Sequence, residues 1–168
     1  MDKNQINGLL RPKSVAVIGA STTPGKIGYT VVDNLVKGGY AGTIYPINPT
    51  ATELLGLKVY PTITDVPGKI DSAIVTVPAK LLPAVTEECG KKGVKGLIVI
   101  TSGFSEVGNK ALEEEMVSIA KSYNMRILGP NIVGSLSNSD KFNGSFAPCL
   151  PLAALLVSCR LLSFISIP

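Results

Sequence analysis

The feature that most constrains the fold is an alternation of short apolar runs with amphipathic helical patterns, repeated about every 25 residues. Each run is aliphatic and stops at glycine, proline or asparagine, which is typical of a parallel strand buried on both faces. We expect strands at residues 14–18, 43–47, 58–60, 72–77, 96–100 and 126–128, and helices at 27–36, 81–89 and 112–123. This order predicts the α/β class with a doubly wound, mostly parallel sheet, whose ligands bind at the carboxyl ends of the strands.

The charge of the chain is weakly positive and evenly spread. Its 168 residues include 16 Lys and Arg against 12 Asp and Glu, which gives a formal net charge of +4. A nucleic-acid-binding surface normally gathers its cations and interleaves them with aromatic side chains, and this sequence does neither. We therefore expect no nucleic-acid partner, and the mild positive balance suits a small phosphorylated ligand.

Cysteine usage and hydropathy favour a reducing compartment and no membrane. The three cysteines, Cys89, Cys149 and Cys159, are odd in number and form no CxxC pair, so neither a disulfide framework nor a zinc site is predicted. The N-terminus lacks the apolar core of a signal peptide, and no run of about 18 apolar residues could cross a bilayer. The expectation is a cytoplasmic protein.

Histidine is absent from the 168 residues. A mechanism that needs imidazole as a base, a metal ligand or a phosphoryl carrier therefore cannot run on this chain alone. No catalytic residue and no metal-binding residue is predicted.

A glycine-rich loop joins the first strand to the first helix. It reads Gly19, Ala20, Ser21, Thr22, Thr23, Pro24, Gly25, Lys26, Ile27 and Gly28. Glycine lets a backbone approach a ligand closely, the helix start offers unpaired N–H groups, and Lys26 adds a positive charge. The loop predicts a phosphate or pyrophosphate site, although a turn needed only for tight strand-to-helix packing would have the same composition.

The loop matches none of three well-known phosphate-binding patterns. Ser21 stands where the dinucleotide fingerprint GxGxxG needs its second glycine, and the second strand ends without the acidic residue that an NAD ribose requires. Ile27 follows Lys26 where a P-loop would place the serine or threonine that holds Mg²⁺. A flavodoxin-like FMN loop finds no specific match either.

Five motifs, each weak alone, occur in order at successive strand ends. They are residues 11–21 with 24–28, Tyr45 to Pro49, Val77 to Ala79, Thr101 to Phe104 with Glu106, and Gly129 to Asn131. Together they resemble the ADP-forming acyl-CoA synthetases, which share a superfamily with the succinyl-CoA synthetase α subunit. The likeness covers roughly residues 8–150.

The resemblance implies a Rossmann-like coenzyme A-binding domain over residues 1–150. It implies that the first loop, through Gly19, Ala20, Ser21, Thr22, Pro24, Gly25, Lys26 and Gly28, cradles the CoA phosphates. It places Asn48 and Pro49 beside the adenosine, Val77, Pro78, Ala79, Ser102, Gly103 and Phe104 along the pantetheine arm, and Asn131 at the closing turn. Each of these contacts also has a purely structural alternative, as a strand terminator, a helix start or a turn.

The family reaction converts an acid, CoA and ATP into acyl-CoA, ADP and phosphate through a phosphohistidine and an ATP-grasp portion. This chain has no histidine and no such portion, so the resemblance implies a CoA-binding part that is catalytically incomplete alone and works with a second ligase subunit or an ATP-grasp chain. A stand-alone CoA-binding regulatory module, an NAD(P)-binding oxidoreductase and an interaction-only domain stay open as alternatives.

The sequence departs from the family pattern at its end. Leu155 to Ser158 begin like the first strand of the following ligase domain, but Cys159 to Leu162 replace the expected polar glycine turn. Residues 151–168 are therefore interpreted as a truncated or frame-shifted start of that domain. An apolar segment of this kind is expected to pack poorly or to associate, so a homo-oligomer is predicted.

Overall fold

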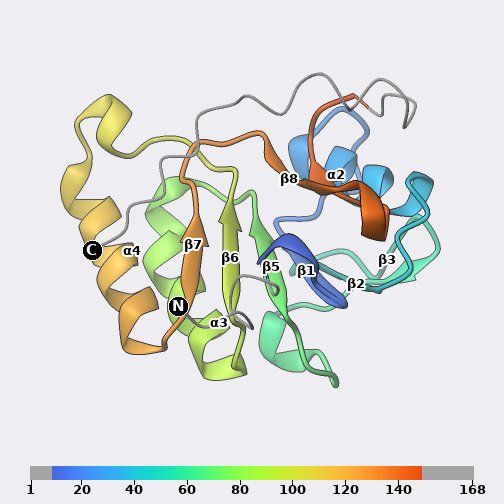
Figure 1. Cartoon of the computed structure of the whole chain (residues 1–168), viewed down its shortest axis with the longest axis horizontal. Coiled ribbons are helices and arrows are strands. Elements are labelled where there is room, and N and C mark those ends of the chain that lie inside the picture. The colour runs from blue at the N-terminus through green and yellow to red at the C-terminus, as the bar shows by residue number, and fades with distance from the viewer. Residues whose placement is uncertain (1–8, 149–168) are drawn as a thin grey trace.

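A five-stranded parallel sheet forms the centre of the chain in the computed structural model, which describes residues 9–148 (Figure 1). Its strands are β1 (Ser14–Ile18), β2 (Thr43–Ile47), β5 (Ser72–Val75), β6 (Gly96–Val99) and β7 (Arg126–Leu128). They lie in the order β2-β1-β5-β6-β7, and every neighbouring pair is parallel. The predicted α/β fold with a doubly wound, mostly parallel sheet is confirmed.

Helices cover the sheet because successive strand residues point to opposite faces. Val15 and Val17 of β1 pack in one core with α2 (Ile27–Lys37), whereas Ala16 and Ile18 pack in the other core with α3 (Leu82–Lys92) and α4 (Lys110–Ser122). Both cores are mostly aliphatic, and full burial of each large side chain stabilises the fold by about 1.5–3 kcal/mol.

Two strands end earlier than the apolar runs predict. The runs extend to Val77 and Ile100, but the paired strands end at Val75 in β5 and at Val99 in β6. The remaining apolar residues of each run continue beyond the sheet at its carboxyl edge. Hydropathy cannot distinguish these positions from strand residues, because loop and strand share the same apolar surroundings there.

A small hairpin follows the second strand of the sheet. It pairs β3 (Glu53–Leu54) with β4 (Leu57–Lys58), so the strand expected at 58–60 begins and ends earlier. Tyr60 instead forms a single parallel bridge with Ile47 at the end of β2. A 3₁₀ helix, η1 (Ile63–Asp65), then packs against α3 on the way to β5.

A second hairpin, absent from the sequence-based expectation, joins α2 in covering its face of the sheet (Figure 1). It consists of β8 (Gly134–Ser137) and β9 (Phe142–Ser145), which pair antiparallel. Phe142 is buried in the core beside α2. The hairpin escapes sequence analysis because serine, glycine and asparagine dominate its strands and weaken the hydrophobic alternation.

Two expectations concern residues that lie wholly or partly outside the described part of the chain. The interpretation of residues 151–168 as an altered domain start, and the association predicted from them, fall outside residues 9–148. Within 9–148, no helix has both the length and the apolar content needed to cross a membrane. Cys89 in the same stretch is buried with a free thiol, and burial raises its pKa.

The hairpin is fastened to α2 by one buried amide. Asn34 donates from Nδ2 to the carbonyl oxygens of Ser145 and Ala147, each at 2.8 Å. We expect Asn34→Ala to leave these acceptors unpaired and to lower the free energy of unfolding by about 1–3 kcal/mol. Urea denaturation measures this difference.

Lys37→Ala, at an exposed position on the same helix, is the matched control and should cost less than about 1 kcal/mol. Equal unfolding midpoints for the two variants would show that the amide does not hold the hairpin.

Candidate binding site at the carboxyl edge of the sheet

The strand order creates a switch point between β1 and β5. The chain passes from β1 to β2 on one side and then returns to β5 on the other side of β1. Loops that leave neighbouring strands in opposite directions open a crevice at their carboxyl ends, which is where doubly wound sheets bind ligands. The glycine-rich first loop begins at this point, directly after β1.

Two of the predicted glycines are needed for packing. Gly19 has φ +90°, and a Cβ there would lie 2.7 Å from Oγ1 of Thr76. A Cβ on Gly28 would lie 2.1 Å from the carbonyl oxygen of Gly19, so only glycine allows α2 to begin this close to the end of β1. Gly25 differs, because its φ of +85° favours glycine while no atom lies within 4 Å of the Cβ position.

The N-terminus of α2 is open. Lys26 is the N-cap residue and is exposed, no side chain among residues 9–148 caps the helix, and its first turn carries no acidic residue. The first amides of a helix and its dipole attract an anion when no side chain satisfies them. The Lys26 ammonium forms no ion pair with any described residue, so no carboxylate in this part of the chain compensates the charge at this end.

Part of the first loop is held by the protein itself. The amides of Gly19 and Ala20 both donate to the carbonyl of Ile47, at 3.1 and 3.2 Å. The amide of Thr23 donates to Oγ of Ser21 at 3.1 Å, while Thr22 and Pro24 are exposed beside them. The loop therefore offers a ligand its later residues and the helix start rather than its first two amides.

The Asn48 side chain forms hydrogen bonds to neighbouring loops. Its Nδ2 donates to the carbonyl of Ala20 at 2.7 Å, and its Oδ1 accepts from the amides of Thr50 and Ala51. Pro49, the next residue, is exposed. The side-chain amide thus ties the end of β2 to the first loop, and contact with an adenosine there remains a prediction.

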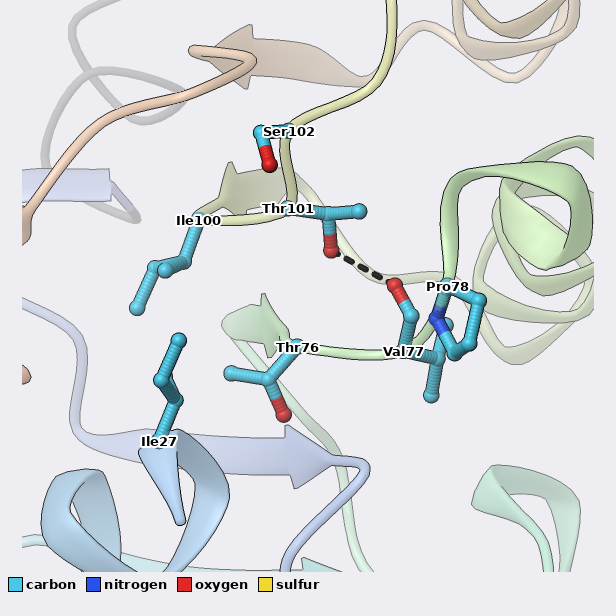
Figure 2. Close-up of a pocket in the computed structure, with 7 residues that line it drawn as sticks. All are labelled: Ile27, Thr76, Val77, Pro78, Ile100, Thr101 and Ser102. Carbon is cyan, nitrogen blue, oxygen red and sulfur yellow. Dashed lines mark hydrogen bonds between the residues drawn. The ribbon is translucent and has the colours of Figure 1, made fainter. Parts of the chain in front are cut away.

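A pocket of about 290 Å³ opens beside the start of α2 (Figure 2). Its walls come from α2 and from the residues that follow β5 and β6, namely Ile27, Thr76, Val77, Pro78, Ile100, Thr101 and Ser102. Three of these, Val77, Pro78 and Ser102, belong to the predicted site.

The other four lining residues were missed by sequence analysis. Thr76 is the first residue after β5, Ile100 and Thr101 are the first two residues after β6, and Ile27 is the first residue of α2. Their placement immediately after or before an element was the available signal. Thr101 donates from Oγ1 to the carbonyl of Val77 at 2.7 Å, whereas the exposed Ser102 hydroxyl has no hydrogen-bond partner among the described residues.

The loop after Ser102 is rigidly braced. The Glu106 carboxylate accepts hydrogen bonds from the amides of Gly103 and Phe104, and the Gly103 bond is the main reason that the pKa of this carboxyl is lowered. The Phe104 side chain is completely buried in the core beside α3 and α4. Its ring presents no surface to a ligand, so only its backbone remains for the predicted pantetheine contact.

The last two predicted residues flank the pocket without lining it. Ala79 begins a 3₁₀ helix, η2 (Ala79–Leu81). Its Cβ would lie 3.2 Å from a Cβ built on Gly103, so the two loops are close together. Asn131 is exposed after the end of β7, has φ +56°, and donates its amide to the carbonyl of Thr101 at 3.0 Å. The structure therefore gathers all the predicted loops at one edge, with the pocket near their middle.

The groups at this edge suit the binding of an anion and of an apolar chain. They are the start of α2, which no described side chain caps, the Lys26 ammonium, which has no ion pair among residues 9–148, an apolar pocket and hydroxyl groups. No three His, Cys, Asp or Glu side chains in residues 9–148 come close enough to hold a metal ion.

Fold and edge together define a nucleotide-phosphate-binding α/β domain. Residues 13–137 match the family described as CoA binding domain, and the chain belongs to that family. Coenzyme A is accordingly the cofactor of this domain.

Known relatives agree with this assignment. The chain is 51% identical over 140 residues to the ADP-forming acetate–CoA ligase of Methanocaldococcus jannaschii, covering 83% of this chain and 20% of that protein. It is 47% identical over 161 residues to the α subunit of ADP-forming acetate–CoA ligase I of Pyrococcus furiosus, covering 91% and 35%. The chain thus spans about a fifth of the first of these relatives and about a third of the second.

A solved structure of Ca. Korarchaeum cryptofilum shows the same fold. It is a dinucleotide-forming acetyl-coenzyme A synthetase 1 in complex with phosphate and ADP, and it superposes with a TM-score of 0.86 at 51% identity. The match covers 88% of this chain and 32% of that one.

Gly28 provides a test of the close approach between α2 and β1. Alanine normally stabilises a helix relative to glycine, by about 1 kcal/mol. Because the new Cβ would collide with the Gly19 carbonyl, we expect Gly28→Ala to lower the free energy of unfolding by about 1–3 kcal/mol instead. Urea denaturation gives the sign.

Val36→Ala, on the exposed side of the same helix, should change stability by no more than about 0.5 kcal/mol. A Gly28→Ala variant as stable as the parent protein would mean that the helix start has room to move.

Proposed function

We propose that this chain provides the CoA-binding domain of an ADP-forming acyl-CoA synthetase, which converts an acid, CoA and ATP into acyl-CoA, ADP and phosphate. The observation that carries the proposal is the uncapped N-terminus of α2, with the Lys26 ammonium, directly beside the pocket. The ligase names of the relatives support the reaction class.

The diphosphate of CoA is assigned to the start of α2. Its negative charge complements the open amides, the positive end of the helix dipole and Lys26. Ser21, Thr22, Pro24 and Gly25 form the loop that would wrap this group, with Asn48 and Pro49 on the adenosine side. The absence of a carboxylate after β2 fits CoA, since its ribose lacks the free vicinal diol that an NAD site reads.

The pantetheine arm is assigned to the pocket between the ends of β5 and β6. Val77, Pro78 and Ile100 offer apolar surface to its methylene and methyl groups, and the unpartnered hydroxyl of Ser102 can donate to one of its amide carbonyls. Ala79, Gly103 and Phe104 supply backbone beside this path, and Asn131 lies at its far end. The arm would then leave the edge with its thiol exposed to a reaction partner.

This chain would contribute binding and thiol presentation rather than phosphoryl transfer. None of its 168 residues is a histidine, so a phosphohistidine must come from elsewhere in the enzyme. A second ligase subunit or an ATP-grasp chain or domain fills that role in our proposal. A reducing cytoplasm suits both the free thiol of Cys89 and the thiol of CoA.

Ligand ranking separates this proposal from an NAD(P)-binding oxidoreductase. We expect 1 mM CoA to raise the melting temperature of the chain, because a ligand that binds only the folded state stabilises it. NAD and NADP at the same concentration should leave the melting temperature unchanged. A larger shift with either dinucleotide would overturn the CoA assignment in differential scanning fluorimetry.

Lys26 tests the position of the phosphates. Loss of one charge-assisted contact should weaken CoA binding about tenfold in Lys26→Ala, and the loss should shrink as salt rises. Lys95→Ala is the matched control, because Lys95 is exposed immediately before β6, at the opposite edge of the sheet. Titration calorimetry at low and high salt compares the two. Equal dissociation constants for both variants would remove Lys26 from the site.

A further inference from the structure

Thr76 makes contacts that the binding proposal does not use. It is the first residue after β5, and its Oγ1 donates toward two carbonyl oxygens of the neighbouring strand end, Ile18 at 3.0 Å and Gly19 at 3.2 Å. Its backbone amide also donates to the Ile18 carbonyl, at 2.9 Å. Thr76 therefore holds, by hydrogen bonds, the backbone at the point where β1 passes into the glycine-rich loop.

The Gly19–Ala20 peptide, whose carbonyl accepts from Thr76, also packs against the start of α2. The Gly19 carbonyl lies against Gly28 in the first turn of α2, so closely that a Cβ on Gly28 would come within 2.1 Å of its oxygen. On the other side of the same peptide, the Ala20 amide donates to the Ile47 carbonyl. The Gly19–Ala20 peptide is thus held at its oxygen by β5 and at its nitrogen by β2.

Gly19 makes such a clamp necessary. Its φ of +90° is open to glycine alone at low cost, and glycine also leaves the adjoining peptide free to rotate in the absence of other contacts. Rotation of this peptide would turn its oxygen away from Thr76 and toward or away from α2, and the helix start would move with it.

We propose that Thr76 is a positioning residue for coenzyme A: its hydroxyl holds the Gly19 carbonyl, and thereby the N-terminus of α2, in the orientation that binds the diphosphate. This inference rests on the proposed function. Figure 2 shows the Thr76 hydroxyl pointing away from Ile100 and Ser102, while its methyl group points toward Ile27. The hydroxyl accordingly bonds to the end of the neighbouring strand, and the methyl group forms part of the pocket wall.

Thr43 offers a matched comparison at the other end of the sheet. It is the exposed first residue of β2, at the amino ends of the strands, and its amide donates to the carbonyl of Lys13 at 2.9 Å. It lines no part of the pocket. A loss that depends on the clamp should appear at Thr76 and not at Thr43.

The test compares Thr76→Val, Thr76→Ser and Thr43→Val in the 168-residue chain, with CoA as the titrant. We expect Thr76→Val to raise the dissociation constant about fivefold, since one hydrogen bond is lost. Thr76→Ser, which keeps the hydroxyl, should bind within about twofold of the parent chain, and so should Thr43→Val. If Thr76→Val does not fold, Thr76→Ala replaces it in the same comparison.

A double variant shows whether Thr76 acts through the helix start. If it does, Thr76→Val should weaken binding much less in a Lys26→Ala background than in the parent chain, because both changes damage one phosphate site. Purely additive losses would contradict a positioning role. Parent-like CoA affinity in Thr76→Val, with Lys26→Ala still impaired, would overturn the inference and leave the proposed function intact.

Amide hydrogen exchange tests the clamp without ligand. Amides of residues 20–28 should exchange faster in Thr76→Val than in the parent chain, whereas Lys26→Ala should not change them. Unchanged exchange would refute the clamp. If the parent chain fails to bind CoA while the exchange rates respond as expected, the proposed function fails and the structural clamp stands.

Discussion

The contact between the Gly19 carbonyl and Gly28 governs the geometry of this domain's binding edge. It sets how closely α2 can begin to the end of β1, and both positions must lack a side chain for that approach. Because α2 starts here, its free amides face the switch point of the sheet rather than solvent along its flank. The anion site that we propose depends on this steric fit, and the charge of Lys26 would add to it.

Several residues at this edge use their side chains to hold the loops of the proposed site in place. Asn48 and Thr76 reach the first loop from β2 and β5, and each uses its side chain on a backbone carbonyl. Glu106 holds the loop after β6 in another way, because its carboxylate accepts hydrogen bonds from two backbone amides. A ligand therefore meets a surface that is already ordered, which lowers the entropy cost of binding.

Sequence analysis succeeded where the physics is local. The aliphatic runs marked all five strands of the central sheet, and the glycine-rich loop was placed at the end of the first strand. It failed where an element depends on distant contacts. The β8–β9 hairpin has little hydrophobic alternation and is stabilised instead by Phe142 in the α2 core and by Asn34. Phe104 was expected along the ligand path, yet its ring is buried, because its loop turns back toward the helices.

By itself the sequence determined the fold class, the family, and the edge of the sheet at which the predicted loops gather. These follow from periodicity and from short motifs at strand ends, which are properties of neighbouring residues. Only the tertiary structure decided which polar groups stay available there. The Asn48 side chain and the amides of Gly19 and Ala20 form hydrogen bonds to other loops. The first amides of α2 and the Ser102 hydroxyl have no partner among the described residues. That division depends on hydrogen bonds between segments up to 58 residues apart, which no local pattern encodes.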